Sequence, residues 1–157
     1  MQTVESERTL NSILDDYGAA TGLGPALSSE DGVFCIESDC DHVINFLQHP
    51  ENQSVFIWMV VGDVPNVNRE AFLTRLLESN LFWWTTDGAT LSLLPDGESV
   101  VLTKKIQLQD LNSGNIHQTI EDYLNFSERF DRWVIEATHD KQLELNAEEI
   151  EESGLRV

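Results

Sequence analysis

The stretch ESNLFWWTTDGATLSLLPDGESVVL, residues 78–102, decides the fold that we predict for this chain. Apolar residues occupy alternate positions on both sides of PDG (95–97). Alternation of this kind predicts strands. Proline and glycine suit a tight turn, because proline presets φ and glycine accepts a positive φ. We therefore expect a hairpin with strands over 89–94 and 100–106.

Helical spacing appears on both sides of this hairpin. Residues 67–82 have apolar side chains at helical intervals, with Asn66 or Asn68 as a cap. After the hairpin we expect a long helix, with a start like a capping box at Asn115 and Gln118. Its apolar stripe consists of Ile116, Ile120, Tyr123, Phe130 and Val134.

The N-terminal part of the chain predicts one helix and three strands. The apolar stripe of the helix consists of Leu10, Ile13, Leu14 and Tyr17. We expect the helix to end at Gly18 or Gly22. The strands are expected over 33–38, 42–48 and 54–62, and the third is apolar throughout, as in a central strand buried on both faces.

The order of elements, α-β-β-β-α-β-β-α, predicts an α+β fold. We expect a mostly antiparallel, twisted sheet with the helices packed largely on one face. The 157 residues suit a single domain, which we place at residues 1–137. Residues 138–157 carry six acidic residues against Lys141 and Arg156, which predicts a flexible, solvated tail.

Charge limits the classes of partner. The net charge of -19 opposes binding to nucleic acid and to anionic membranes, because both interactions depend on Lys and Arg. The longest apolar run, residues 55–62, is far shorter than the roughly 18–20 residues that span a bilayer. The residues MQTVESERTL do not resemble a secretory signal, so we expect a cytoplasmic protein.

Motifs for catalysis or cofactor binding are absent from the sequence. It has no phosphate-binding glycine loop and no G-x-S-x-G motif. Residues 35–49 contain Cys35, Cys40, His42 and His49, but their spacing does not match common zinc sites. A nucleophilic Cys–His pair with His42 or His117 lacks an identifiable third group. We therefore expect no enzyme activity, no metal and no cofactor.

Four large apolar residues, Leu81, Phe82, Trp83 and Trp84, end the second predicted helix. In one interpretation Phe82 and one tryptophan pack the helix end onto the sheet, as buried aromatic rings commonly do. In the other, at least one ring contacts a subunit or partner, because tryptophan is enriched at interfaces.

The region 67–134 resembles the class I type III secretion chaperones of the Tir-chaperone family. The resemblance rests on a helix with a Leu-Leu-x-x-Asn-Leu pattern, a small-residue step, two strands around a turn, and a last helix ending near a tryptophan. The matching positions are Leu76, Leu77, Asn80, Leu81, Gly88, Ala89, Leu91, Leu93, Val100, Leu102, Leu108 and Trp133. The adjacent tryptophans depart from the pattern, which has smaller or polar residues there.

The resemblance implies a cytoplasmic homodimer that works without ATP. Such a protein binds an N-terminal segment of a secreted effector in extended form and keeps it competent for export. Carried over to this chain, the partner-binding residues are Leu10, Ile13, Leu14, Val33, Phe34, Ile36, Ile44 and Phe46, unless they are ordinary core. The dimer contact is carried over to Phe72, Leu73, Leu76, Leu77, Trp83 and Trp84.

Other functions remain open at this point. A chaperone-fold regulator would sequester a partner that is never secreted. A small-ligand domain, or a hydrolase that uses Cys35 and His42, would instead be a monomer with an enclosed pocket. The long acidic tail leaves room for a further partner, such as the secretion ATPase.

Overall fold

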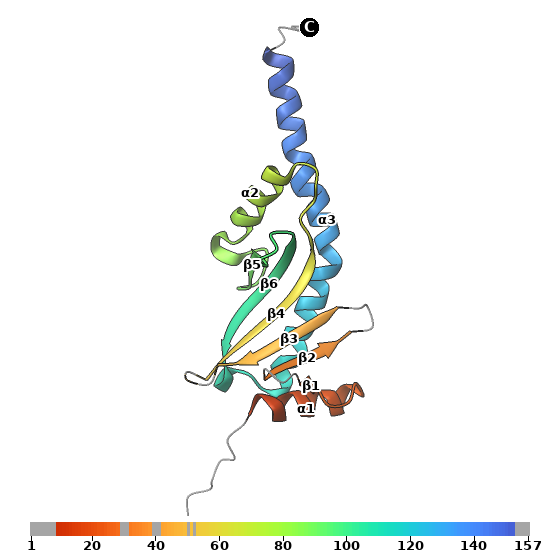
Figure 1. Cartoon of the computed structure of the whole chain (residues 1–157), viewed down its shortest axis with the longest axis vertical. Helices are drawn as coiled ribbons and strands as arrows, with labels where there is room; N and C mark the ends of the chain where they lie inside the picture. Colours follow the sequence, from red (N-terminus) through yellow and green to blue (C-terminus); the bar gives the residue numbers. More distant parts are fainter. Residues whose placement is uncertain (1–8, 29–31, 39–41, 50, 52, 153–157) are drawn as a thin grey trace, which may run out of the picture. The chain divides into compact units, whose positions relative to one another are not determined.

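The computed structural model describes residues 9–28, 32–38, 42–49, 51 and 53–152, with the backbone alone for 27, 113 and 137–152. The elements follow the predicted order, with a short strand and two 3-10 helices added (Figure 1). They are α1 (Leu10–Thr21), β1 (Leu27–Ser28), β2 (Val33–Glu37), β3 (Val43–Gln48), β4 (Ser54–Asp63), α2 (Arg69–Ser79), η1 (Leu81–Trp83), β5 (Thr90–Leu93), β6 (Ser99–Gln107), η2 (Leu108–Asp110) and α3 (Ser113–Glu152).

The strands form one sheet in the order β1-β2-β3-β4-β6-β5. Successive pairs from β1 to β4 are antiparallel, and Phe46 stands opposite both Phe34 and Ile57. Because side chains alternate across a strand, these three residues share one face of the sheet. The predicted α+β fold with a mostly antiparallel sheet is confirmed.

By contacts the chain divides into two compact units. The first comprises residues up to Val60 together with 103–124, and the second comprises 61–102 together with the residues from 125 onward. Each unit has buried apolar residues of its own.

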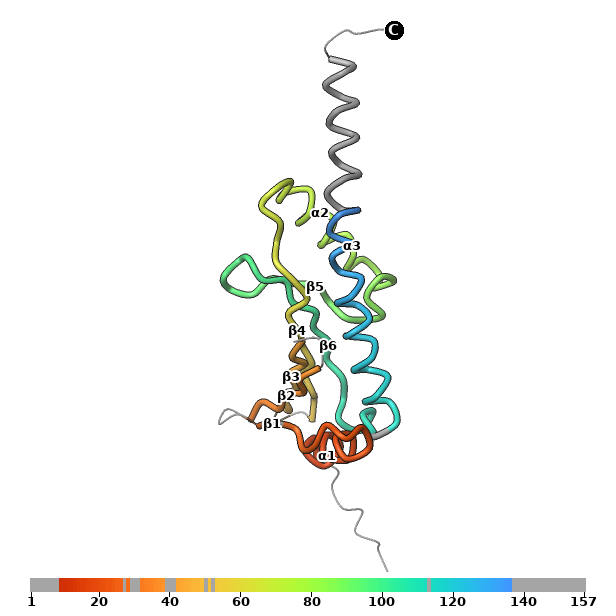
Figure 2. The backbone as a smooth tube through the Cα atoms, turned by 90° about the vertical axis from the view of Figure 1, so that its right-hand side faces the viewer, coloured from red at the N-terminus to blue at the C-terminus, as the bar shows by residue number. Residues whose placement is uncertain are grey.

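In the first unit, α1 and the start of α3 lie side by side (Figures 1 and 2). The Tyr17 and His117 rings are 5.8 Å apart. The Tyr123 hydroxyl donates a 2.9 Å hydrogen bond to the Ile57 carbonyl of β4 and accepts one from the Lys104 amide of β6. Tyr123 therefore ties α3 to two strands.

In the second unit, aromatic rings join α2 to α3. The Phe72 ring meets those of Phe130 and Trp133 edge-on, with centroids 6.4 and 5.5 Å apart. Gly62 makes room for this cluster, since a Cβ there would lie 2.6 Å from the Phe130 ring. Glycine is thus required at this position of β4 by packing.

Helix ends differ in detail from the predictions. Helix α1 ends at Gly22, with φ 77°, which is one of the two glycines predicted. Asn68 is the N-cap of α2, but it is left-handed and its side chain caps nothing. A capping box exists at α3, three residues earlier than expected. The Asn112 side chain accepts from the Asn115 amide, and the Asn115 side chain accepts from the Asn112 amide.

The C-terminal segment begins as helix. The backbone of α3 continues through Glu152, so the predicted tail from residue 138 starts as its extension. Residues 153–157 lie outside the described part of the chain. The division into a domain and a flexible tail stays a prediction.

Candidate partner-binding surfaces

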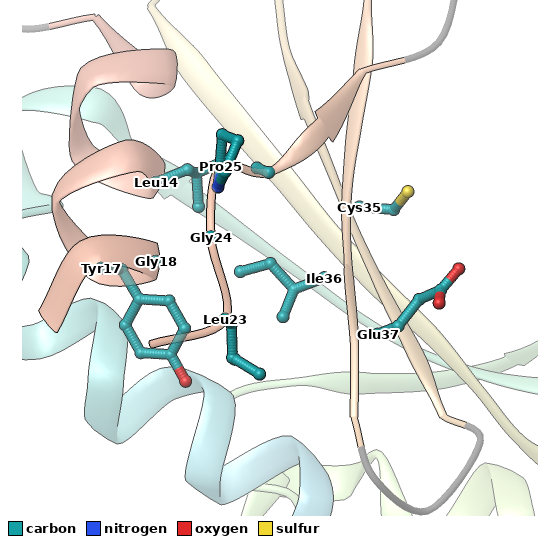
Figure 3. A pocket seen from close by; sticks show the side chains of 10 residues that line it. Leu14, Tyr17, Gly18, Leu23, Gly24, Pro25, Cys35, Ile36 and Glu37 are labelled. Atoms are coloured by element: carbon teal, nitrogen blue, oxygen red, sulfur yellow. The ribbon is translucent and has the colours of Figure 1, made fainter. Parts of the chain in front are cut away.

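The first candidate surface is a cavity of about 270 Å³ between α1, the following loop and β2 (Figure 3). Leu14, Leu23 and Ile36 supply apolar side chains to its wall. Tyr17 adds a polar group from α1. Such a cavity suits an apolar side chain of a partner.

The loop that closes this cavity depends on Gly18. The Gly24 amide donates a 3.3 Å hydrogen bond to the Gly18 carbonyl. A Cβ at Gly18 would lie 1.8 Å from the Gly24 oxygen. The loop can therefore cross α1 closely, and Pro25 then leads into β1 beside the cavity.

Strand β1 begins the strand order and pairs with β2 at Leu27↔Cys35 and Ser28↔Phe34. No strand of the described chain pairs with its other side. An edge of this kind offers main-chain groups to an added strand.

The tyrosine in the cavity is a neutral hydrogen-bonding group. Burial raises the pKa of Tyr17, and the nearby Glu121 carboxylate raises it further. His117, whose ring lies against Tyr17, is 3.0 Å from Glu121 between Nε2 and Oε1. Because its pKa is raised, the Tyr17 hydroxyl remains protonated at neutral pH.

The predicted partner-binding residues fall into three groups. Leu10, Ile13, Ile44 and Phe46 are buried and belong to the core. Leu14 and Ile36 are also buried, but they line the cavity. Val33 and Phe34 are half-buried on β2. The prediction missed Tyr17, Leu23, Gly24, Pro25, Ala26, Cys35 and Glu37, which also line the cavity.

The second candidate surface is an apolar strip at the end of α2, formed by Leu77, Leu81, Phe82, Trp83 and Trp84. Exposed fractions are 70% for Leu77, 65% for Phe82 and 86% for Trp84. The Phe82 and Trp84 rings stack with centroids 5.4 Å apart. Exposed apolar groups of this size commonly mark an interaction site.

The backbone of the strip is strained. Phe82 and Trp83 have φ of 60° and 52°, a region that bulky residues rarely adopt. The Trp83 indole N–H donates to the Thr90 hydroxyl at 3.2 Å, which holds that ring against β5. Residues under such strain cluster at functional sites.

The predicted dimer residues also divide by exposure. Phe72 and Leu76 are buried in their own unit, and Leu73 is half-buried. Leu77, Trp83 and Trp84 are exposed. The interpretation that Phe82 packs the helix end onto the sheet is wrong for this chain, because the ring is 65% exposed.

The residues considered above for metal binding or catalysis do not form a recognisable site in the described part of the chain. Among the described residues, no group of three or more His, Cys, Asp or Glu is placed to hold a metal ion. Cys35 lies half-buried on β2, and Cys40 lies outside the described residues. No helix in the described ranges has the length and apolar character needed to cross a bilayer.

Comparison with known proteins identifies a family for this chain. The model of the Tir chaperone protein (CesT) family matches residues 12–131. A search of curated protein sequences gave no significant match.

Several solved structures share the fold. A chain of the ExsC–ExsE complex superposes with a TM-score of 0.70 at 17% identity, covering 85% of this chain and 97% of that one. The Yersinia pestis type III secretion chaperone SycH, in complex with a fragment of YscM2, gives 0.61 at 18% identity, covering 76% and 97%. A chain of the HopA1–SchA chaperone-effector complex gives 0.60 at 13% identity, covering 74% and 88%.

Proposed function

We propose that this chain, which belongs to the Tir chaperone protein (CesT) family, is a type III secretion chaperone that binds an extended segment near the N-terminus of an effector. The bound segment is kept stable and competent for export, and no ATP is used. The site of action is the bacterial cytoplasm. The observation that carries this proposal is the cavity beside the open edge of β1.

The edge and the cavity offer an extended segment complementary contacts. Main-chain groups of the segment would continue the sheet at β1. A side chain that points toward α1 would enter the cavity between Leu14, Leu23 and Ile36. The main-chain contacts supply affinity for any sequence, and the cavity selects for an apolar residue at one position.

Binding of this kind needs no catalytic group. Burial of apolar surface is favourable by itself and requires no hydrolysis step. An ATP-independent holding function is therefore consistent with membership of this family. We accordingly propose that the protein is not an enzyme and has no cofactor.

The apolar strip supports a homodimer. A second copy would cover Leu77, Phe82 and Trp84, which are otherwise exposed to water. Phe72 and Leu76 are buried, so they would pack beneath the strip inside their own copy and would not contact the second copy.

The test is capture of partners by the tagged chain from the source cytosol, followed by limited proteolysis and mass spectrometry. We expect a secreted protein that is protected only over a segment near its N-terminus. The variant Leu23→Asp should lose this partner, because it places a charge in the cavity at a residue that is already 51% exposed.

Val67→Asp is the matched control for this capture. It introduces the same charge at an exposed apolar residue outside both the cavity and the apolar strip. Retention of the partner by Leu23→Asp would contradict the assigned site. Recovery of a partner that is never secreted would instead indicate a chaperone-fold regulator.

A further inference from the structure

A second cavity in the first unit, of about 450 Å³, has a different chemical character from the first. Its lining consists of Thr9, Gln48, Gln53, Gln107, Leu108, Gln109 and Leu111. Four of the seven glutamines of the chain are gathered here. None of the described residues that line the cavity is charged, although charged residues make up 24% of the sequence.

The fold brings these glutamines together at one end of the sheet. Gln48 ends β3, Gln53 precedes β4 and Gln107 ends β6, and these three strands are neighbours. Gln109 belongs to η2, directly after β6. The cavity is therefore built from the ends of three adjacent strands and one helical turn.

Hydrogen bonds fix this end of the sheet. The Leu108 amide donates to the Gln53 carbonyl at 2.7 Å, so the turn before β4 is tied to η2. Gln53 has a φ of 54°, an uncommon value for a residue other than glycine. Gln107 donates from Nε2 to the hydroxyl of Ser54, a fully buried residue, at 3.3 Å.

The amide groups retain capacity for a ligand. Gln48 donates from Nε2 to Oε1 of Gln53 at 3.1 Å. Each glutamine amide has two N–H donors and an oxygen that accepts two bonds. The hydrogen bonds from Gln48 to Gln53 and from Gln107 to Ser54 use only part of this capacity. The cavity can therefore donate and accept at the same time.

Its lining disfavours most ligand classes. The described lining has no Lys or Arg as a counter-charge for a phosphate or carboxylate, and no Asp or Glu as one for a cation or metal. The same residues include no aromatic ring on which a sugar or nucleobase could stack. A neutral group that both donates and accepts fits best.

We propose that this cavity binds a side-chain carboxamide, from Asn or Gln, of a partner polypeptide. A carboxamide pairs with glutamine amides through two complementary hydrogen bonds, and the buried Leu108 and Leu111 provide apolar surface for its methylene groups. That the polypeptide is the effector rests on the function proposed above. Binding would be independent of pH near neutrality, because carboxamides do not titrate.

The test is an NMR titration of the full chain with N-acetyl-glutamine N′-methylamide. We expect saturable shifts of the side-chain amide signals of Gln48, Gln53, Gln107 and Gln109. The glutamate and leucine analogues should bind about tenfold more weakly, because neither can make both bonds. Equal binding of all three analogues, or no shift of these signals, would overturn the proposal.

Two matched variants localise the effect. Gln109→Glu should weaken binding of the glutamine analogue by about tenfold, since it removes a donor and adds a charge at an exposed position. Gln118→Glu makes the same change on α3 outside the cavity and should leave binding unchanged. An equal loss in both variants would contradict a site at this cavity.

The outcome is distinguishable from that of the effector capture. If the chain captures an effector but its cavity does not bind the glutamine analogue, only the assignment of the carboxamide site is wrong. If the cavity binds the analogue in a chain that captures no effector, the carboxamide site stands and the proposed function is wrong.

Discussion

Asn80 connects the end of α2 to β5 through its side chain. Its Nδ2 donates to the Leu91 carbonyl at 2.9 Å, and its Oδ1 accepts from the Leu91 amide at 2.8 Å. The carboxamide thus pairs with one residue of the strand as a neighbouring strand would. This explains in physical terms the asparagine of the Leu-Leu-x-x-Asn-Leu pattern.

Replacing Asn80 with alanine should destabilise the fold. Both bonds to Leu91 would be lost, and a partly buried main-chain group left without its partner costs about 1–3 kcal/mol. Urea unfolding followed by circular dichroism measures the change. Asn11→Ala, at an exposed position of α1, is the control and should change the free energy of unfolding by less than about 0.5 kcal/mol. Equal effects would contradict the role assigned to Asn80.

Because of Tyr123, we expect the free energy of unfolding to depend on pH in the alkaline range. Burial raises the pKa of its hydroxyl above the ordinary 10.0, and the bond from the Lys104 amide only partly offsets this. In the unfolded chain the hydroxyl ionises near its ordinary value, whereas in the folded chain it remains protonated. The contribution of this group to stability is therefore complete below pH 10 and is lost as pH rises further.

The variant Tyr123→Phe tests this dependence. At pH 7 it should be less stable by about 1–3 kcal/mol, because the Ile57 carbonyl and Lys104 amide lose a partner. Above pH 10 the difference from the unmodified chain should shrink by up to about 1.4 kcal/mol per pH unit. Unfolding curves at a series of pH values measure it. A difference that stays constant up to pH 12 would contradict the titration assigned to Tyr123.

Single residues also show what sequence patterns can and cannot predict. Spacing correctly identified the stripe of α1, because every third or fourth residue of a helix lies on the side that faces the core. It could not separate Leu14, which lines a cavity, from Leu10, which does not. Both residues are leucines in the same helical stripe. Their surroundings differ because of the loop that crosses α1 at Gly18.

At the scale of elements, the end of α2 departs most from expectation. A helix followed by a hairpin was predictable, but the left-handed backbone at Phe82 and Trp83 was not, since bulky residues disfavour it. This backbone conformation lets the rings of Phe82 and Trp84 stack on each other, and both residues remain exposed. The glutamine-lined cavity was equally hidden, because it requires knowing which strand ends are adjacent.

The apolar strip predicts the effect of charges on assembly. Leu77→Asp combined with Trp84→Asp should convert a dimer into monomers, because the apolar burial of two large side chains per copy, each worth about 1.5–3 kcal/mol, would be lost. Light scattering gives the molar mass. Both residues are exposed, so circular dichroism should be unchanged.

Val67→Asp is the control for this pair. Val67 is 71% exposed and precedes α2, outside the strip. It should leave the molar mass as it was. If the double variant remained dimeric with intact circular dichroism, the strip would not be the subunit contact.

At the scale of the whole molecule, the acidic C-terminal segment accounts for part of the net charge of -19. Residues 139–157 contain six acidic and two basic residues. Like charges at this density repel one another, and a lone helix of this length is marginally stable in water. We therefore expect the segment to contribute little to the stability of the fold, and its contact with a further partner, such as the secretion ATPase, stays a prediction.

Deleting residues 139–157 should accordingly leave the melting temperature unchanged within about 2 °C. A chain ended at residue 125 is the contrasting control. It lacks Phe130 and Trp133, whose rings pack with that of Phe72, and Phe126, whose ring packs with that of Phe130. It should therefore fail to fold. Differential scanning calorimetry measures both. A fall of more than about 8 °C on removing 139–157 would mean that this segment packs against the rest of the protein, and the boundary near residue 138 would then be wrong.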